Sequence, residues 1–137
     1  MDYSELFKEG MVFEQSFLVK EEYLAGHIGT GSARVLSTPW LIALMEITSH
    51  RLLAAHLPEG SSSVGIEVNM RHLAPTPPGK PVRVRAEVLM VEKNTVAFHV
   101  QAWDDVEQIG DCQHKRAIID VARFLKRVES KTGTPAA

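Results

Sequence analysis

The chain has 137 residues, enough for one domain with a sizeable core and too few for two. Its net charge of −2, with both signs scattered along the chain, gives no electrostatic surface for nucleic acid. One cysteine, Cys112, excludes an internal disulfide. No apolar run has signal-peptide length at the N-terminus or approaches the ~20 residues that cross a bilayer. The sequence predicts a soluble, cytoplasmic protein that binds neither nucleic acid nor membrane.

The N-terminal third contains a predicted strand followed by a glycine-rich segment. Residues 11–20 form the strand, and residues 25–32, AGHIGTGS, follow it without any periodicity. This segment matches neither GxGxxG nor the Walker pattern, so no phosphate-binding loop is predicted. A plain loop and a mobile flap both fit it.

A long helix is predicted from Thr38 to about Leu57. Thr38 is a good N-cap, Pro39 suits the first helical position, and residues 56–60, HLPEG, end the helix. Residues 40–47 are apolar on every side except at Glu46. Because this half of the helix has no polar face, it must be surrounded by other parts of the protein.

After the helix the period changes from helical to alternating. In a strand over residues 64–72 we expect one apolar face, made by Val64, Ile66, Val68 and Met70. Residues 75–79, PTPPG, break it, and further strands follow over 82–90, 96–102 and from Gln108 to about Phe124. Residues 129–137, ESKTGTPAA, are expected to form a disordered tail.

This order predicts an α+β fold in which an antiparallel sheet wraps around a long central helix. Residues 1–128 form a single domain in this interpretation. A sheet around one helix leaves strand edges and part of the helix uncovered. Pairing with a second copy would cover both, so a homodimer, or a dimer of dimers, is expected.

Glu46 is the first candidate for chemistry, because an unpartnered carboxylate in an apolar helix is costly. His72 continues the alternation of the strand before it and is predicted to face the helix. A neutral imidazole facing a lone carboxylate is the arrangement of a general acid/base pair. The alternative for His72 is an ordinary hydrogen-bonded core histidine.

Thr38 is the third candidate. Its hydroxyl can cap the helix, or it can face a substrate carbonyl at the positive end of the helix dipole, together with the N–H groups of the first turn. Eight residues separate Thr38 from Glu46, which is roughly 12 Å along a helix. The two residues therefore act at opposite ends of a bound acyl group, or one comes from each subunit.

The remaining polar residues give weaker signals. No histidines have metal-ligand spacing, so no metal site and no cofactor are predicted. Cys112 is expected to be buried and inert. Lys115 and Arg116 could bind a phosphate group. The alternative without a functional role is that they lie on a solvated strand face.

Three segments of the chain resemble hot-dog-fold acyl-CoA thioesterases, and among these the bacterial fluoroacetyl-CoA thioesterase family. They are LSTPWLIALMEI around Thr38 and Glu46, VGIEVNMRHLAPTPPG around Gly65 and His72, and IGDCQHKRAIID around Arg116. The resemblance extends from about residue 10 to 127. Two features differ: the segment after the first strand has no lid phenylalanine, and a Gly-Thr-His-Glu-Arg-like stretch of the family keeps only His114 and Arg116 here.

The resemblance implies a hot-dog fold and a catalytic trio of Thr38, Glu46 and His72. It also implies that Gly65 lies against the substrate thioester, that Arg116 contacts the bound acyl-CoA, and that the sites form at a dimer interface. The expected activity is hydrolysis of a small acyl-CoA thioester, with the acyl group left open. A non-catalytic acyl-CoA-binding or small-ligand-binding protein and an enoyl-CoA hydratase-type lyase are the alternatives.

Overall fold

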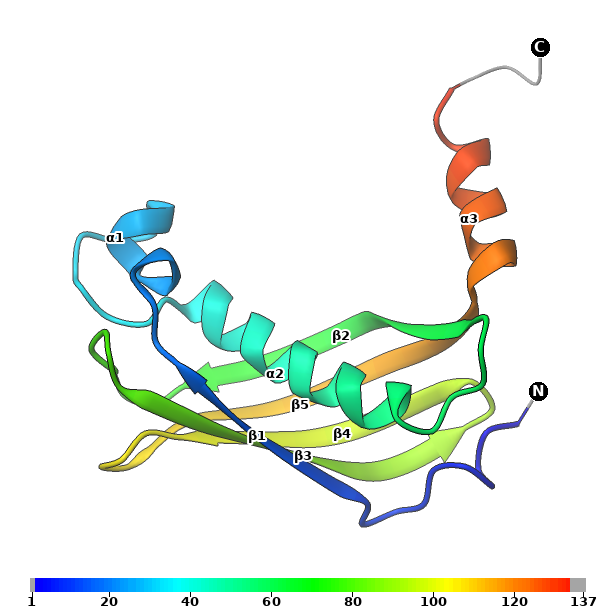
Figure 1. The fold of residues 1–137 in the computed structure, drawn as a ribbon, viewed down its shortest axis with the longest axis horizontal. Helices are drawn as coiled ribbons and strands as arrows, with labels where there is room; N and C mark the ends of the chain where they lie inside the picture. Colours follow the sequence, from blue (N-terminus) through cyan, green and yellow to red (C-terminus); the bar gives the residue numbers. More distant parts are fainter. Residues whose placement is uncertain (1, 134–137) are drawn as a thin grey trace.

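The structure, a computed structural model, describes residues 2–133 and contains one antiparallel sheet wrapped around a long helix, α2 (Figure 1). The strand order in the sheet is β1-β3-β4-β5-β2. α2 spans Thr38–Ala54 and lies in the curl of the sheet. The α+β architecture expected from the sequence is confirmed. The five strands are β1 (Val12–Leu18), β2 (Ser61–His72), β3 (Pro81–Glu92), β4 (Thr95–Trp103) and β5 (Gln108–Asp120).

The core lies between α2 and the concave face of the sheet. Leu41, Leu44 and Leu53 of α2 are fully buried, and so are Val84 of β3 and Phe98 of β4. Each buried leucine contributes about 2 kcal/mol by removal of apolar surface from water. One flank of α2 stays half-buried in the single chain. It consists of Ile42, Ala43, Glu46 and Ile47.

β2 is an edge strand, paired only with β5, and its register shifts between Gly65 and Glu67. The shift leaves Ile66 as an extra residue, which is a β-bulge. Before the bulge Gly65 lies opposite Arg116, and after it Val68 lies opposite His114. The bulge therefore resets which residues face α2 midway along the strand.

The bulge makes one part of the predicted strand wrong. Val64 lies opposite Ala117, on the face turned away from α2, because directly paired residues of two antiparallel strands share a face. Ile66 is 54% exposed. The second half of the strand keeps the predicted orientation, and His72 faces the start of α2.

Two short helical segments connect β1 to α2. They are η1 (Glu21–Tyr23) and α1 (Ala25–Ile28). The glycine-rich segment predicted as a loop or flap thus contains one helical turn, which ends at Gly29 in the left-handed conformation. Its two ends are held by a β-bridge between Leu24 and Leu36.

The chain continues beyond β5 as a third helix, α3 (Val121–Ser130). The predicted strand to Phe124 is therefore wrong beyond Asp120, whose side chain accepts the Arg123 N–H at 3.0 Å and caps the helix. Of the tail predicted over residues 129–137, residues 129 and 130 belong to the last turn of α3. Residues 134–137 lie outside the described part of the chain. No helix within residues 2–133 is long and apolar enough to span a membrane.

Candidate active site

The start of α2 brings Thr38 and His72 together. The Thr38 hydroxyl lies 2.8 Å from His72 Nδ1. Ser37, not Thr38, is the N-cap, since its hydroxyl accepts the Trp40 N–H at 3.3 Å. The predicted capping role of Thr38 is therefore wrong, and its hydroxyl is free to bond the imidazole.

His72 has one ring nitrogen engaged and one that needs a partner. Nε2 is buried and has no hydrogen-bond partner among the described residues. Burial lowers the pKa of His72, and the Ala74 backbone carbonyl partly opposes this shift. The ring is therefore neutral at pH 7 and can exchange a proton with a group placed at Nε2. A cavity of about 420 Å³ lies beside the pair and is lined by both Thr38 and His72.

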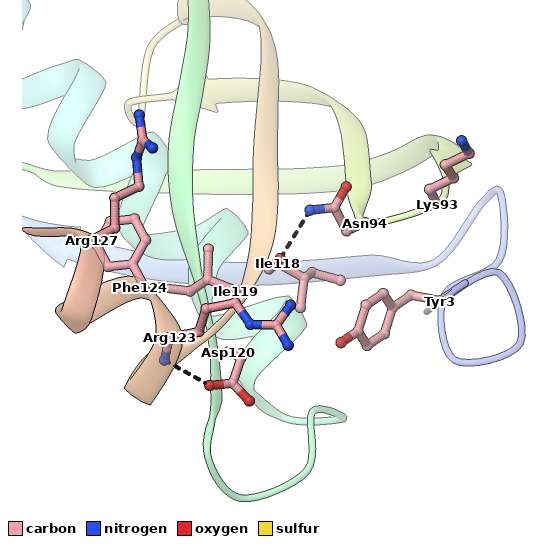
Figure 2. A pocket seen from close by; sticks show the side chains of 9 residues that line it. All are labelled: Tyr3, Lys93, Asn94, Ile118, Ile119, Asp120, Arg123, Phe124 and Arg127. Atoms are coloured by element: carbon pink, nitrogen blue, oxygen red, sulfur yellow. Dashed lines mark hydrogen bonds between the residues drawn. The ribbon is translucent and has the colours of Figure 1, made fainter.

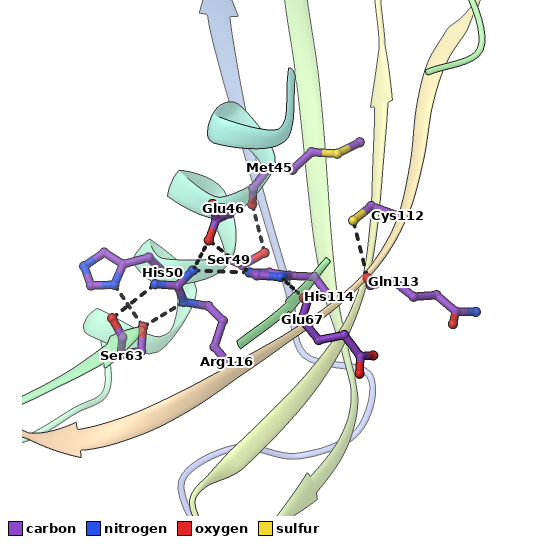
Figure 3. Close-up of polar contacts among 10 residues, drawn as sticks. All are labelled: Met45, Glu46, Ser49, His50, Ser63, Glu67, Cys112, Gln113, His114 and Arg116. Carbon is purple, nitrogen blue, oxygen red and sulfur yellow. Dashed lines mark hydrogen bonds and ion pairs between the residues drawn. The ribbon is translucent and has the colours of Figure 1, made fainter. Parts of the chain in front are cut away.

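Glu46 lies further along α2, and its partner is Arg116 of β5 (Figure 3). Arg116 Nη1 lies 3.2 Å from Glu46 Oε2. The Arg116 side chain is 7% exposed and the Glu46 side chain 38% exposed. The prediction that Arg116 lies on a solvated strand face is therefore wrong. Lys115 points to the other face of the sheet, because side chains alternate along β5.

Further contacts fix the guanidinium of Arg116. Its Nε donates to Ser63 Oγ at 2.9 Å, and Nη2 donates to the Ser63 carbonyl at 3.1 Å. His50 Nδ1 lies 2.9 Å from the same Ser63 hydroxyl. A cavity of about 510 Å³ borders this cluster, and Glu46, His50 and Arg116 are among the residues that line it. Arg116 is thus held rigidly with one N–H group directed at Glu46.

His114 completes the cluster and is almost completely buried. Its Nδ1 lies 2.8 Å from the Glu67 carbonyl, which can only accept, so Nδ1 carries the proton. Nε2 is then an acceptor for Arg116 Nη1 at 3.2 Å. Burial is the main cause that lowers the pKa of His114, and the charge of Arg116 adds to it, while the Glu67 carbonyl and Glu46 oppose it. The neutral imidazole therefore serves as a fixed acceptor beside Glu46.

Gly65 gives the Glu46 carboxylate its space. A Cβ atom at position 65 would overlap Glu46 Oε2 and would lie 3.3 Å from His114 Cε1. Only glycine leaves room here for a carboxylate against the strand backbone. Gly65, Glu46 and Arg116 therefore form one cluster.

The structure separates the predicted residues into two groups. Thr38 and His72 form one, which we call the Thr38–His72 pair, and Glu46, Gly65 and Arg116 form the other, which we call the Glu46 cluster. The imidazole near Glu46 is His114, at 4.0 Å, and not His72. The direct Glu46–His72 pair predicted from the alternation is therefore wrong within one chain. Eight helical residues, or roughly 12 Å, separate Glu46 from Thr38.

Other candidate chemistry is weaker in this structure. Cys112 is buried, and burial raises the pKa of its thiol to about 11, so the reactive thiolate is not formed near pH 7. Within residues 2–133, no three His, Cys, Asp or Glu side chains are grouped in a way that could hold a metal ion.

Comparison with known proteins gives consistent results. The model of the fluoroacetyl-CoA-specific thioesterase family matches residues 19–122. A fluoroacetyl-CoA thioesterase of Streptantibioticus cattleyicolor is 38% identical over 98 residues, which cover 72% of this chain and 70% of that protein. A mutant of the fluoroacetyl-CoA enzyme solved in complex with acetyl-CoA has a TM-score of 0.87 at 32% identity, with 92% and 99% of the two chains covered.

A hot-dog-like protein from Thermanaerovibrio acidaminovorans has a similar fold, with a TM-score of 0.89 at 26% identity over 97% of this chain and 98% of that one. The fold is therefore the hot-dog fold. Since the family model matches most of the sequence, the chain belongs to the fluoroacetyl-CoA-specific thioesterase family.

Proposed function

We propose that the protein hydrolyses a small acyl-CoA thioester to the free acid and coenzyme A, at a site assembled from two copies of the chain. The activity is that of its family. The observation that supports the composite site is the separation of the Thr38–His72 pair from the Glu46 cluster, together with the unpartnered His72 Nε2. The Thr38–His72 pair lies where α2 begins and β2 ends. The Glu46 cluster lies near the middle of α2, beside Gly65 of β2.

The uncovered surfaces of the single chain support dimerisation along β2. The outer edge of β2 has no strand partner among the described residues, and Ile66 and Val68 on it are exposed. The half-buried flank of α2 lies next to this edge. A twofold axis between Gly65 and His72 would pair two β2 strands antiparallel and cover both surfaces. The Thr38–His72 pair of one copy would then lie beside the Glu46 cluster of the other.

In this arrangement each group has a defined role. Glu46 attacks the thioester carbonyl directly or activates the water that does so. The Thr38 hydroxyl positions the carbonyl oxygen. The neutral His72 takes up at Nε2 the proton that water loses and passes it to the departing thiolate sulfur of CoA. The first turn of α2 offers fewer N–H donors than the sequence predicts, because Pro39 has no N–H and the Trp40 N–H is bonded to Ser37. Thr38 therefore carries the polarising role at that helix end.

Subunit complementation tests the proposal. Thr38→Ala and Glu46→Gln homodimers should each lose about 100-fold or more in the hydrolysis of acetyl-CoA, measured by release of free thiol. Unfolding and refolding an equal mixture should restore about a quarter of the wild-type activity, because half of the dimers are mixed and each has one intact site. A mixture no more active than its parents would contradict the composite site. Mixed Thr38→Ala and His72→Ala subunits are the control, and they should restore nothing.

Isotope labelling detects an acyl-glutamyl intermediate. Repeated turnover in oxygen-18 water should leave label in the Glu46 carboxylate if such an anhydride forms and water attacks its Glu46 carbonyl carbon. Direct attack by water on the thioester, like attack on the acyl carbonyl carbon of the anhydride, puts the label in the released acid instead. Mass spectrometry of the peptide that contains Glu46 measures the label.

A further inference from the structure

Positive charge is concentrated at the C-terminal helix of a chain that is negative overall. Residues 121–131 contain Arg123, Lys126, Arg127 and Lys131 but only one acid, Glu129. Elsewhere on the surface, basic side chains such as Arg34 and Arg83 are paired with glutamates. The basic side chains of α3 form no ion pair within residues 2–133.

A cavity of about 470 Å³ lies at the base of α3, where β5 ends (Figure 2). Tyr3 and Phe124 flank it from opposite sides, and Ile118 and Ile119 contribute apolar surface between them. We call it the α3 cavity. Its lining consists of Tyr3, Lys93, Asn94, Ile118, Ile119, Asp120, Arg123, Phe124 and Arg127.

The α3 cavity combines flat apolar surface with a positive rim. Lys93, Arg123 and Arg127 are its basic residues, and Asp120 is its one acid. The Asp120 carboxylate already accepts the Arg123 N–H. Arg123 and Arg127 are four residues apart, so they lie on one face of α3. Aromatic rings stack on a planar base, and guanidinium groups bind phosphate oxygens in pairs, so this composition suits a phosphorylated nucleotide.

The position of the α3 cavity matches the length of the substrate. Arg116 and Asp120 are four residues apart in β5, or roughly 13 Å along the strand. The pantetheine arm of CoA has about a dozen bonds between its sulfur and its first phosphate, as many as four extended residues, so it spans roughly 14 Å. A thioester held at the Glu46 cluster would therefore place its nucleotide end near the base of α3.

We infer that the α3 cavity binds the adenosine 3′-phosphate 5′-diphosphate end of the CoA thioester. The purine lies between Tyr3 and Phe124, and the phosphates contact Arg123, Arg127 and Lys93. This inference rests on the proposed function, which places the thioester at the Glu46 cluster.

The test compares acetyl-CoA with acetyl-pantetheine, which has the same thioester and no nucleotide. The wild-type enzyme should favour acetyl-CoA by tenfold or more in kcat/KM, mainly through KM. In the Arg123→Ala/Arg127→Ala variant this preference should fall at least tenfold. The matched control, Lys126→Ala/Lys131→Ala, removes two charges from the same segment outside the cavity lining, and it should keep the preference. Equal preferences in all three proteins, or equal losses in both variants, would overturn the inference.

Direct binding separates this inference from the proposed function. Adenosine 3′,5′-bisphosphate should bind the wild-type protein in isothermal titration calorimetry, and its affinity should fall at least tenfold in Arg123→Ala/Arg127→Ala. Glu46→Gln should bind it as the wild type does. If no thioester is hydrolysed but this binding pattern is found, the proposed function fails and the nucleotide site stands. If thioesters are hydrolysed and the bisphosphate does not bind, the nucleotide site fails alone.

Discussion

A side chain at position 65 would occupy the space of the Glu46 carboxylate. Glu46 is the far end of a flexible side chain, so in Gly65→Ala it would swing away and lose its contact with Arg116. We expect kcat/KM for acetyl-CoA to fall about 100-fold, as displacement by an ångström can do, while the melting temperature changes by only a few degrees. Thiol release and thermal unfolding measure the two effects.

Gly31→Ala is the matched control, because a Cβ there meets nothing closer than 3.8 Å. Its activity should stay within about twofold of wild type. If Gly65→Ala were equally active, the space beside Glu46 would not matter for the reaction.

At this scale the sequence singles out Glu46 but not the residues that surround it. Glu46 is conspicuous because it is the one polar residue in an apolar run. Ser63 and His114 belong to different strands and meet only around the Arg116 guanidinium. No local sequence pattern predicts these contacts, because they depend on the register of the strands and on the length of the Arg116 side chain.

At the N-terminus of α2 the adjacent hydroxyls of Ser37 and Thr38 have different partners, the Trp40 N–H and the His72 ring. Ser37→Ala removes the cap of the helix and should lower the free energy of unfolding by about 1 kcal/mol with activity largely kept. Thr38→Ala removes the hydroxyl beside His72 and should lower activity by about 100-fold with stability largely kept. Urea unfolding measures the loss of stability, and thiol release measures the loss of activity. If Thr38→Ala lowered stability and Ser37→Ala lowered activity, Thr38 would be the capping residue.

The elements themselves are largely predictable from periodicity. α2, β3 and β4 are found where the sequence predicts them, because each has one clear period over many residues. The sequence analysis does not predict α3, although its signal is present: Asp120 is a good N-cap, and helical spacing relates Val121, Phe124, Leu125 and Val128. The alternation of β5 leads directly into this helical spacing, so the sequence carries no turn signal that marks where the strand ends and the helix begins.

Three partly or fully buried histidines make the stability of the whole molecule depend on pH. Burial is the first cause that lowers the pKa of His50, His72 and His114 below the ordinary value of 6.5. The unfolded chain therefore binds more protons than the folded chain as the pH falls below about 6.5, so acid favours unfolding. Stability should be complete above that pH and should decrease progressively below it.

Urea unfolding at pH 7.5 and pH 5.5 tests this expectation. His114→Gln keeps an acceptor near Arg116 and removes one titrating group, so the loss of stability between the two pH values should shrink. The groups that face His114 are Glu46 of α2, Arg116 of β5, the Glu67 carbonyl of β2 and the Phe98 ring of β4. An unchanged pH dependence would show that His114 does not titrate in this range.

The bulge in β2 changes how many residues separate two side chains that face the same side of the sheet. In a regular strand, residues that face the same side of the sheet are an even number of positions apart. Gly65 and His72 are seven positions apart, yet both face α2. Ile66 supplies the extra residue that turns this odd interval into a same-face one. The odd Gly-to-His interval is therefore itself a signature of the bulge, readable without a structure. Relatives that share the site should preserve the parity of this interval, so that changes of two residues are tolerated within it and changes of one are not.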